Sequence, residues 1–145
     1  MIQQLIILFF AMAIHTNHNP GATKSKVMDE KEHKVIMQVT QADSAQQLVV
    51  VGQISNILKA LPNAKIEVVC HSQGINLLVA SQSKAVKHVK ELIERGVVFA
   101  VCENTMERKQ IMKEDLLPGV TTVPSGMAEL VLKQEMGWIY VKAGL

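Results

Sequence analysis

Apolar and polar positions divide the chain into two kinds of segment, short continuous apolar runs and longer stretches with helical spacing. Five apolar runs, several of them rich in β-branched residues, predict strands at residues 35–39, 65–71, 97–102, 121–123 and 138–142. The stretches between them predict helices that begin at the capping residues Asp43, Ser83, Asn104 and Ser125. Pro62, Gly96 and Gly137 are typical of helix ends.

The regular alternation of strands and helices predicts one small α/β domain over residues 33–145. Short connections imply right-handed crossovers, and therefore helices on both faces of an open, mostly parallel sheet. In such sheets ligands bind beyond the carboxyl ends of the strands. We therefore look for functional side chains where the predicted strands end.

Residues 1–22 form a separate region, an apolar leader followed by a polar linker. The segment from Ile2 to Ile14 is shorter than the roughly 20 residues of a membrane span, so we expect no stable membrane span. It matches the core of a secretory signal, with Ala11-Met12-Ala13 as a cleavage site, although no Lys or Arg precedes it. We expect a periplasmic or secreted protein; the alternative is a cytoplasmic protein whose leader is a core strand or buried helix.

Composition narrows the function classes. Of 145 residues 48% are hydrophobic, which is enough for a real core, and the formal charge is only +2. With 3% aromatic residues and no basic stripe, we expect no nucleic-acid binding. His15 and His18 lack a Cys or carboxylate cluster, so we interpret their segment as a tether and expect no metal.

Known catalytic motifs are also missing. The segment Cys70-His71-Ser72-Gln73-Gly74 resembles a hydrolase nucleophile elbow, but it lacks the first glycine, and no histidine follows His88. Neither a dinucleotide fingerprint nor a P-loop is present, and nothing calls for an organic cofactor.

Cys102 ends the third predicted strand, two residues before the predicted helix cap at Asn104. A thiol beside a helix start is near unpaired N–H groups and a positive dipole end, which favours the thiolate. That chemistry suits sulfur transfer or redox reactions. The alternative is a small buried apolar side chain.

His71 ends the second predicted strand and fits three roles: proton donor, ligand contact, or a strand-end histidine bonded to backbone. Cys70 is interpreted as a core residue. In an oxidising compartment a Cys70–Cys102 disulfide is a further alternative, provided that the two strand ends are neighbours.

Residues 65–145 resemble the DsrE/DsrF-like family, whose members are associated with sulfur relay. The first matching pattern, G-V-x-F-x-x-C-x-N-T, falls on Gly96, Val97, Phe99, Cys102, Asn104 and Thr105. The second, P-S-G followed by Q-x-x-G-W, falls on Pro124 to Gly126, Gln134, Gly137 and Trp138. The chain departs from the family at Ser72, where relatives commonly read H-G-x-G.

The resemblance implies a three-layer α/β/α fold with about five parallel strands, and assembly into a homotrimer or homohexamer. It implies that Cys102 carries a persulfide that passes to or from a sulfur-relay partner protein. It also implies ligand contacts for His71, Gly74 and Asn104. The competing interpretation is a non-catalytic small-ligand-binding or assembly module in which Cys102 is structural.

Overall fold

The computed structural model describes residues 31–144, so the apolar leader and linker at residues 1–22 lie outside the described residues. Five strands form one sheet, at Lys34–Val39 (β1), Lys65–Cys70 (β2), Val98–Cys102 (β3), Thr121–Val123 (β4) and Ile139–Lys142 (β5). The helices are Ser44–Ala60 (α1), Val86–Glu94 (α2), Glu103–Lys109 (α3) and Gly126–Glu135 (α4), with 3₁₀ turns at Ser72–Leu77 (η1) and Lys113–Asp115 (η2). All five strands lie where the hydrophobic pattern predicts them.

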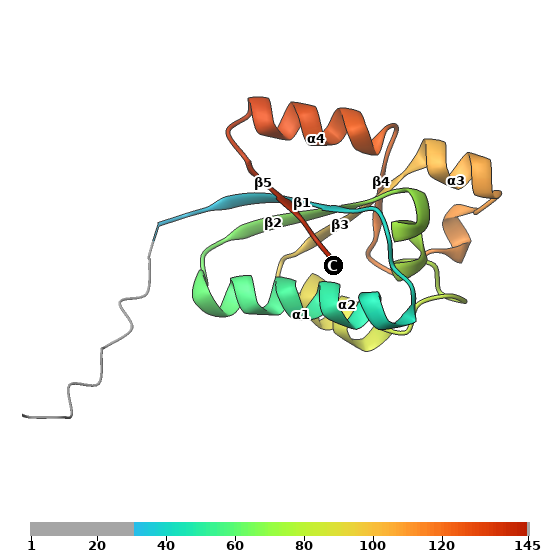
Figure 1. The fold of residues 1–145 in the computed structure, drawn as a ribbon, viewed down its shortest axis with the longest axis horizontal. Helices are drawn as coiled ribbons and strands as arrows, with labels where there is room; N and C mark the ends of the chain where they lie inside the picture. Colours follow the sequence, from blue (N-terminus) through green and yellow to red (C-terminus); the bar gives the residue numbers. More distant parts are fainter. Residues whose placement is uncertain (1–30, 145) are drawn as a thin grey trace, which may run out of the picture.

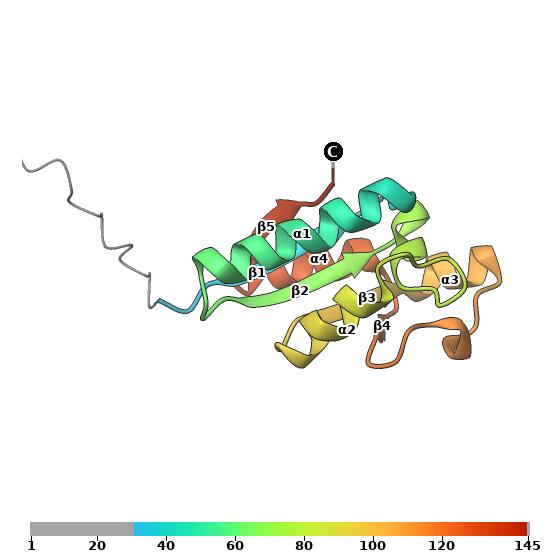
Figure 2. The ribbon, with the colours of Figure 1, turned by 90° about the horizontal axis from the view of Figure 1, so that it is seen from below.

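The strand order is β4-β3-β2-β1-β5, and every pair of neighbouring strands is parallel. From β1 to β4 the chain steps across the sheet in one direction, and it then returns to place β5 beside β1. A right-handed crossover in the reverse direction puts its helix on the opposite face. As a result α1 and α2 cover one face and α4 covers the other (Figures 1 and 2). The three-layer α/β/α prediction is confirmed.

The two faces have cores of different size. Between the sheet and the helices α1 and α2 lies a continuous apolar cluster that includes Met37, Ile54, Val68, Leu92 and Phe99. On the α4 face the buried cluster has four members, Ile36, Val69, Ala100 and Leu130. Alternation of side chains along each strand assigns neighbouring residues to opposite faces.

Two of the four predicted helix starts are confirmed. The Asp43 carboxylate accepts hydrogen bonds from the amides of Ala45 and Gln46, at 3.0 and 2.9 Å. The Ser125 hydroxyl accepts from the amide of Ala128 at 3.4 Å. These side chains occupy amide groups that have no partner within the helix.

The other two predicted starts are wrong. Ala85 occupies the N-cap of α2, and Ser83 instead accepts a hydrogen bond from the Ala85 amide at 3.3 Å, in the turn before the helix. Strand β3 leads into α3 with no intervening residue, so the N-cap is Cys102 rather than Asn104. The spacing of Asn104 and Glu107 matches a capping box, but both residues lie inside the helix.

None of the helices in the described part of the chain is long and apolar enough to cross a membrane.

Candidate functional site

The candidate site lies where β2 and β3 end. The parallel register pairs Cys70 with Val101, so the next residue of each chain segment, His71 and Cys102, lies at the same level of the sheet. Both face the start of α4: a Cβ on Gly126 would lie 3.2 Å from the Cβ of Cys102 and 3.5 Å from that of His71. Two predicted site residues are therefore brought together under a third element that is distant in sequence.

Gly126 allows this close approach. Its missing side chain would also meet Val69 Cγ1 at 3.1 Å, so even a methyl group would press on β2 and β3. Because Gly126 has no Cβ, the first amide of α4 can lie close to the Cys102 thiol. The P-S-G pattern contains this residue, but nothing local in the sequence indicates that it meets Cys102.

Polar groups surround the Cys102 sulfur. Burial opposes ionisation of this side chain, which is 5% exposed, but the nearby amides of Gly126, Thr105 and Asn104 and the Thr105 hydroxyl favour the thiolate. Together these groups outweigh burial and lower the pKa of Cys102 below the ordinary thiol value. The site thus favours a thiolate, and Asn104 contributes through its backbone.

His71 is held in a neutral form by its neighbours. The Gln38 amide nitrogen donates to His71 Nε2 at 2.8 Å, which leaves Nδ1 as the protonated nitrogen facing Ser72 Oγ at 3.1 Å. Partial burial, and then the charge of Arg108, lower the pKa of His71. Gln38 is fixed in turn by the Tyr140 hydroxyl on β5, which donates to its side-chain oxygen. The ring is bonded to two side chains rather than to backbone, and the roles of proton donor and ligand contact stay predictions.

Ser72 stands at the position where the family resemblance expects glycine, and it takes the conformation that favours glycine, with φ of 55°. This backbone aims the Ser72 amide at Thr105 Oγ1, at 3.3 Å. Arg108 Nη2 donates to the same hydroxyl at 3.4 Å. Thr105 therefore connects the thiol to η1 and to the basic end of α3.

Gly74, which the resemblance places among the ligand contacts, is packed against β1. A Cβ there would lie 2.1 Å from the carbonyl oxygen of Val39, and the Gly74 amide donates to Thr40 O at 3.0 Å. This close approach of two backbones gives the glycine a packing role. Its contact with a ligand stays a prediction.

The two cysteines are free thiols in the structure, so the disulfide alternative finds no support there. Cys70 belongs to the core beneath α1 and α2, whereas Cys102 meets Gly126 on the other face. Complete burial raises the pKa of Cys70 and keeps it protonated. The prediction that Cys70 is a core residue is confirmed.

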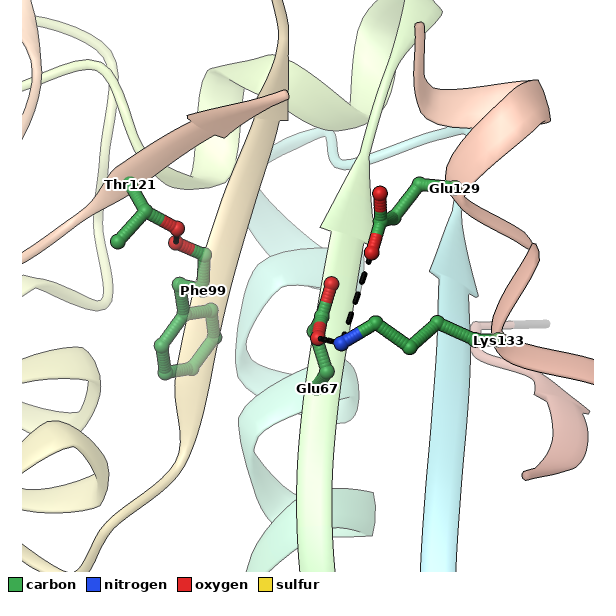
Figure 3. A network of polar contacts seen from close by, with 5 residues as sticks. All are labelled: Glu67, Phe99, Thr121, Glu129 and Lys133. Atoms are coloured by element: carbon green, nitrogen blue, oxygen red, sulfur yellow. Dashed lines mark hydrogen bonds and ion pairs between the residues drawn. The ribbon is translucent and has the colours of Figure 1, made fainter. Parts of the chain in front are cut away.

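A second polar cluster fastens α4 to the sheet (Figure 3). Lys133 Nζ lies 2.5 Å from the carboxylate of Glu67, which is 5% exposed in the middle of β2, and 3.5 Å from that of Glu129. The same ammonium group is 4.5 Å from the centre of the Trp138 ring. Burial tends to lower the pKa of Lys133, but the two carboxylates outweigh it and raise that pKa, so the lysine stays charged.

Within residues 31–144 there is no group of three His, Cys, Asp or Glu side chains that would hold a metal ion.

The comparisons with known proteins agree with this geometry. The model of the DsrE/DsrF-like family matches residues 28–143. The fold is similar to that of MTH1491, a protein of unknown function from Methanobacterium thermoautotrophicum, with a TM-score of 0.72 and 33% identity over 76% of this chain and 98% of that one. It is also similar to the fold of the ychN protein of E. coli, with a TM-score of 0.62 and 14% identity over 77% and 98% of the two chains. No curated protein matches the sequence.

Proposed function

This chain belongs to the DsrE/DsrF-like family, which is associated with sulfur relay, and on that premise we propose that Cys102 carries a sulfane sulfur atom as a persulfide. The observation that carries the proposal is the place of Cys102 at the N-cap of α3 and directly beneath Gly126, where nearby amides and the Thr105 hydroxyl lower the pKa of the thiol. Such donors favour the attacking thiolate, and they stabilise the persulfide anion in the same way.

The transfer needs no external oxidant. The Cys102 thiolate attacks the terminal sulfur of a donor persulfide, RS–SH; one S–S bond forms, the donor S–S bond breaks, and RS⁻ leaves with the electron pair. The product is Cys102–S–SH, and attack by a thiolate of a partner protein on its outer sulfur returns Cys102 to the thiolate. His71 lies beside the thiol in neutral form.

Intact mass measurement after incubation with a small persulfide donor tests this role. We expect the wild-type protein and Cys70→Ser to gain the mass of one sulfur atom, and Cys102→Ser to gain none. Absence of added sulfur on the wild type, or equal addition to Cys102→Ser, would overturn the proposal. Cyanide, which removes sulfane sulfur, should restore the original mass.

The competing candidate is an assembly module, and a specific surface favours it. Large apolar side chains are exposed on α4, on the turn that follows it and on the edge strand β5, at Met127, Val131, Leu132, Met136, Ile139 and Tyr140. We propose that this α4–β5 surface forms a homo-oligomer, a trimer or hexamer, whether or not Cys102 carries sulfur. Light scattering should show an oligomer for the wild type and a monomer for Val131→Lys; a monomeric wild type would exclude assembly through this surface.

We also propose that residues 1–22 direct export, so that the protein works in the periplasm or outside the cell. The support is the apolar segment at Ile2–Ile14 with its small-x-small site. N-terminal sequencing of the protein isolated from cells should begin after Ala13. A mature chain that still begins at Met1 would overturn the export proposal.

A further inference from the structure

A cationic cavity lies between η1 and α3. It has a volume of about 290 Å³ and is lined by Ser72, Gln73, Arg108 and Lys109. Two of these four residues are cations, and the lining, drawn from the described part of the chain, holds no carboxylate. The Lys109 ammonium is oriented across the gap between the two elements by a bond to Gln73 Oε1 at 3.2 Å.

Arg108 is the better oriented of the two cations. Its Nε donates to the carbonyl of Asn104 at 3.3 Å, and its Nη2 donates to Thr105 Oγ1 at 3.4 Å. These bonds bend the side chain back along α3 toward the thiol. A guanidinium has five N–H donors, so further donors remain to bind an anion.

The cavity is linked to Cys102 through one side chain. The Thr105 hydroxyl favours the Cys102 thiolate, and it accepts hydrogen bonds from Arg108 and from the Ser72 amide, both of which belong to residues that line the cavity. The electrostatic effect of Arg108 also reaches His71, beside the thiol.

We propose that the cationic cavity binds small anions and delivers them to Cys102, so that the preferred sulfur donor is a polysulfide anion rather than a neutral polysulfane; this inference rests on the proposed role of Cys102. A narrow chain of sulfur atoms suits a thiol that is only 5% exposed. The Cys102 thiolate attacks the terminal sulfur of a hydrogen tetrasulfide anion. One S–S bond forms and one breaks, Cys102 keeps the –SSH group, and trisulfide leaves with the electron pair.

Two alkylating reagents of similar size but different charge test the cavity without any sulfur donor. Iodoacetate is an anion and iodoacetamide is neutral, so the ratio of their rates at Cys102 measures the local potential. A change in the pKa of the thiol affects both rates and cancels in the ratio. The rates are followed on the full chain by peptide-resolved mass spectrometry, which separates Cys102 from Cys70.

In Arg108→Gln we expect the ratio of iodoacetate to iodoacetamide rates to fall about fivefold at low salt, and Lys109→Gln should lower it less. Added sodium chloride should reduce the wild-type ratio toward that of Arg108→Gln. The matched control is Arg95→Gln. Arg95 follows α2 and lies just before β3 begins, whereas Cys102 lies at the other end of the same strand. Arg95→Gln should leave the ratio unchanged.

An unchanged ratio in Arg108→Gln, or an equal fall in Arg95→Gln, would overturn the anion site. Inorganic tetrasulfide then tests the carrier role separately. If the ratio falls as expected but tetrasulfide adds no sulfur to Cys102, the carrier role is wrong and the anion site stands. If tetrasulfide adds sulfur at equal rates to the wild type and Arg108→Gln, the carrier role stands and the cavity does not deliver the donor.

Discussion

The two faces of the sheet carry out different tasks with the same strands. On the face covered by α1 and α2, one continuous apolar core runs from β1 to β3 and includes the completely buried Cys70. On the α4 face four apolar residues form a small core. A buried ion pair between Glu67 on β2 and Lys133 on α4 also holds this helix against the sheet. The comparison shows that the large core beneath α1 and α2 can stabilise the sheet while the α4 face, with its small core, holds a polar site.

The two cysteines express this contrast most directly. They end neighbouring strands, yet burial raises the pKa of Cys70, whereas amide and hydroxyl donors lower that of Cys102. The difference comes from the partners that each face provides. Cys70 is surrounded by apolar side chains, and Cys102 lies at the N-cap of α3 beneath the first amide of α4.

The largest expected effect is a difference in thiol reactivity. In the native protein, iodoacetamide should modify Cys102 at least about a thousand times faster than Cys70, because Cys70 reacts only when the core opens. The Cys102 rate should rise with pH and reach half of its maximum below pH 9.0, the ordinary value for the pKa of a thiol. Time-resolved labelling with peptide mass spectrometry measures both rates. Comparable rates at the two cysteines would contradict the contrast between the faces.

Next in size is the cost of removing core atoms from each face. Ile54→Ala in the large core should lower the free energy of unfolding by about 3 to 5 kcal/mol, since close-packed neighbours cannot fill the space. Leu130→Ala on the α4 face should cost less, about 2 to 3 kcal/mol, because its few neighbours relax more easily. Urea denaturation compares the two variants. A larger loss for Leu130→Ala would reverse the ranking of the faces.

The ion pair that fastens α4 should come third. Lys133→Met leaves the Glu67 carboxylate buried without its partner and should cost about 3 kcal/mol. Adding Glu67→Gln to that variant should recover most of the loss. The control is Lys87→Met, which breaks an exposed pair on α2 and should cost less than about 0.5 kcal/mol. If the double variant recovers nothing, loss of packing rather than of charge explains the effect.

The smallest effect should be a pH dependence from His71. Its folded-state pKa is below the ordinary value of 6.5, so near and below that pH the folded protein binds fewer protons than the unfolded chain. Stability should therefore fall as the pH decreases through 6.5 toward the folded-state pKa, because partial burial and the charge of Arg108 oppose protonation of His71. Denaturation midpoints across this range should depend less on pH in His71→Gln than in the wild type, and an equal dependence in the two proteins would contradict this contribution.

Local signals predicted most of the fold. The short strand β4 has the predicted bounds, and Asp43 and Ser125 cap the helices that they were predicted to cap. Gly96 and Gly137 follow helices with positive φ, as expected for helix stops. These features depend on neighbouring residues alone, which is why a single sequence reveals them.

The candidate site was predicted less completely. The end of β3 at Cys102 was visible in the sequence, but the cap was expected at Asn104, because spacing does not show that β3 enters α3 without a loop. Gly126 and Arg108 were not predicted to act on the thiol. Gly126 comes from a distant segment, and the Arg108 side chain bends back along its helix to Thr105.

By itself, the sequence determined the order of strands and helices, the two cysteines at strand ends and the family patterns around them. Those properties follow from hydrophobic period, capping chemistry and motif spacing, all of which are local. Only the tertiary structure decided that Cys70 and Cys102 belong to opposite faces and that α4 reaches the second of them. The physical reason is the return of the chain from β4 to β5, which moves α4 to the other face and brings the Gly126 amide down onto the Cys102 sulfur.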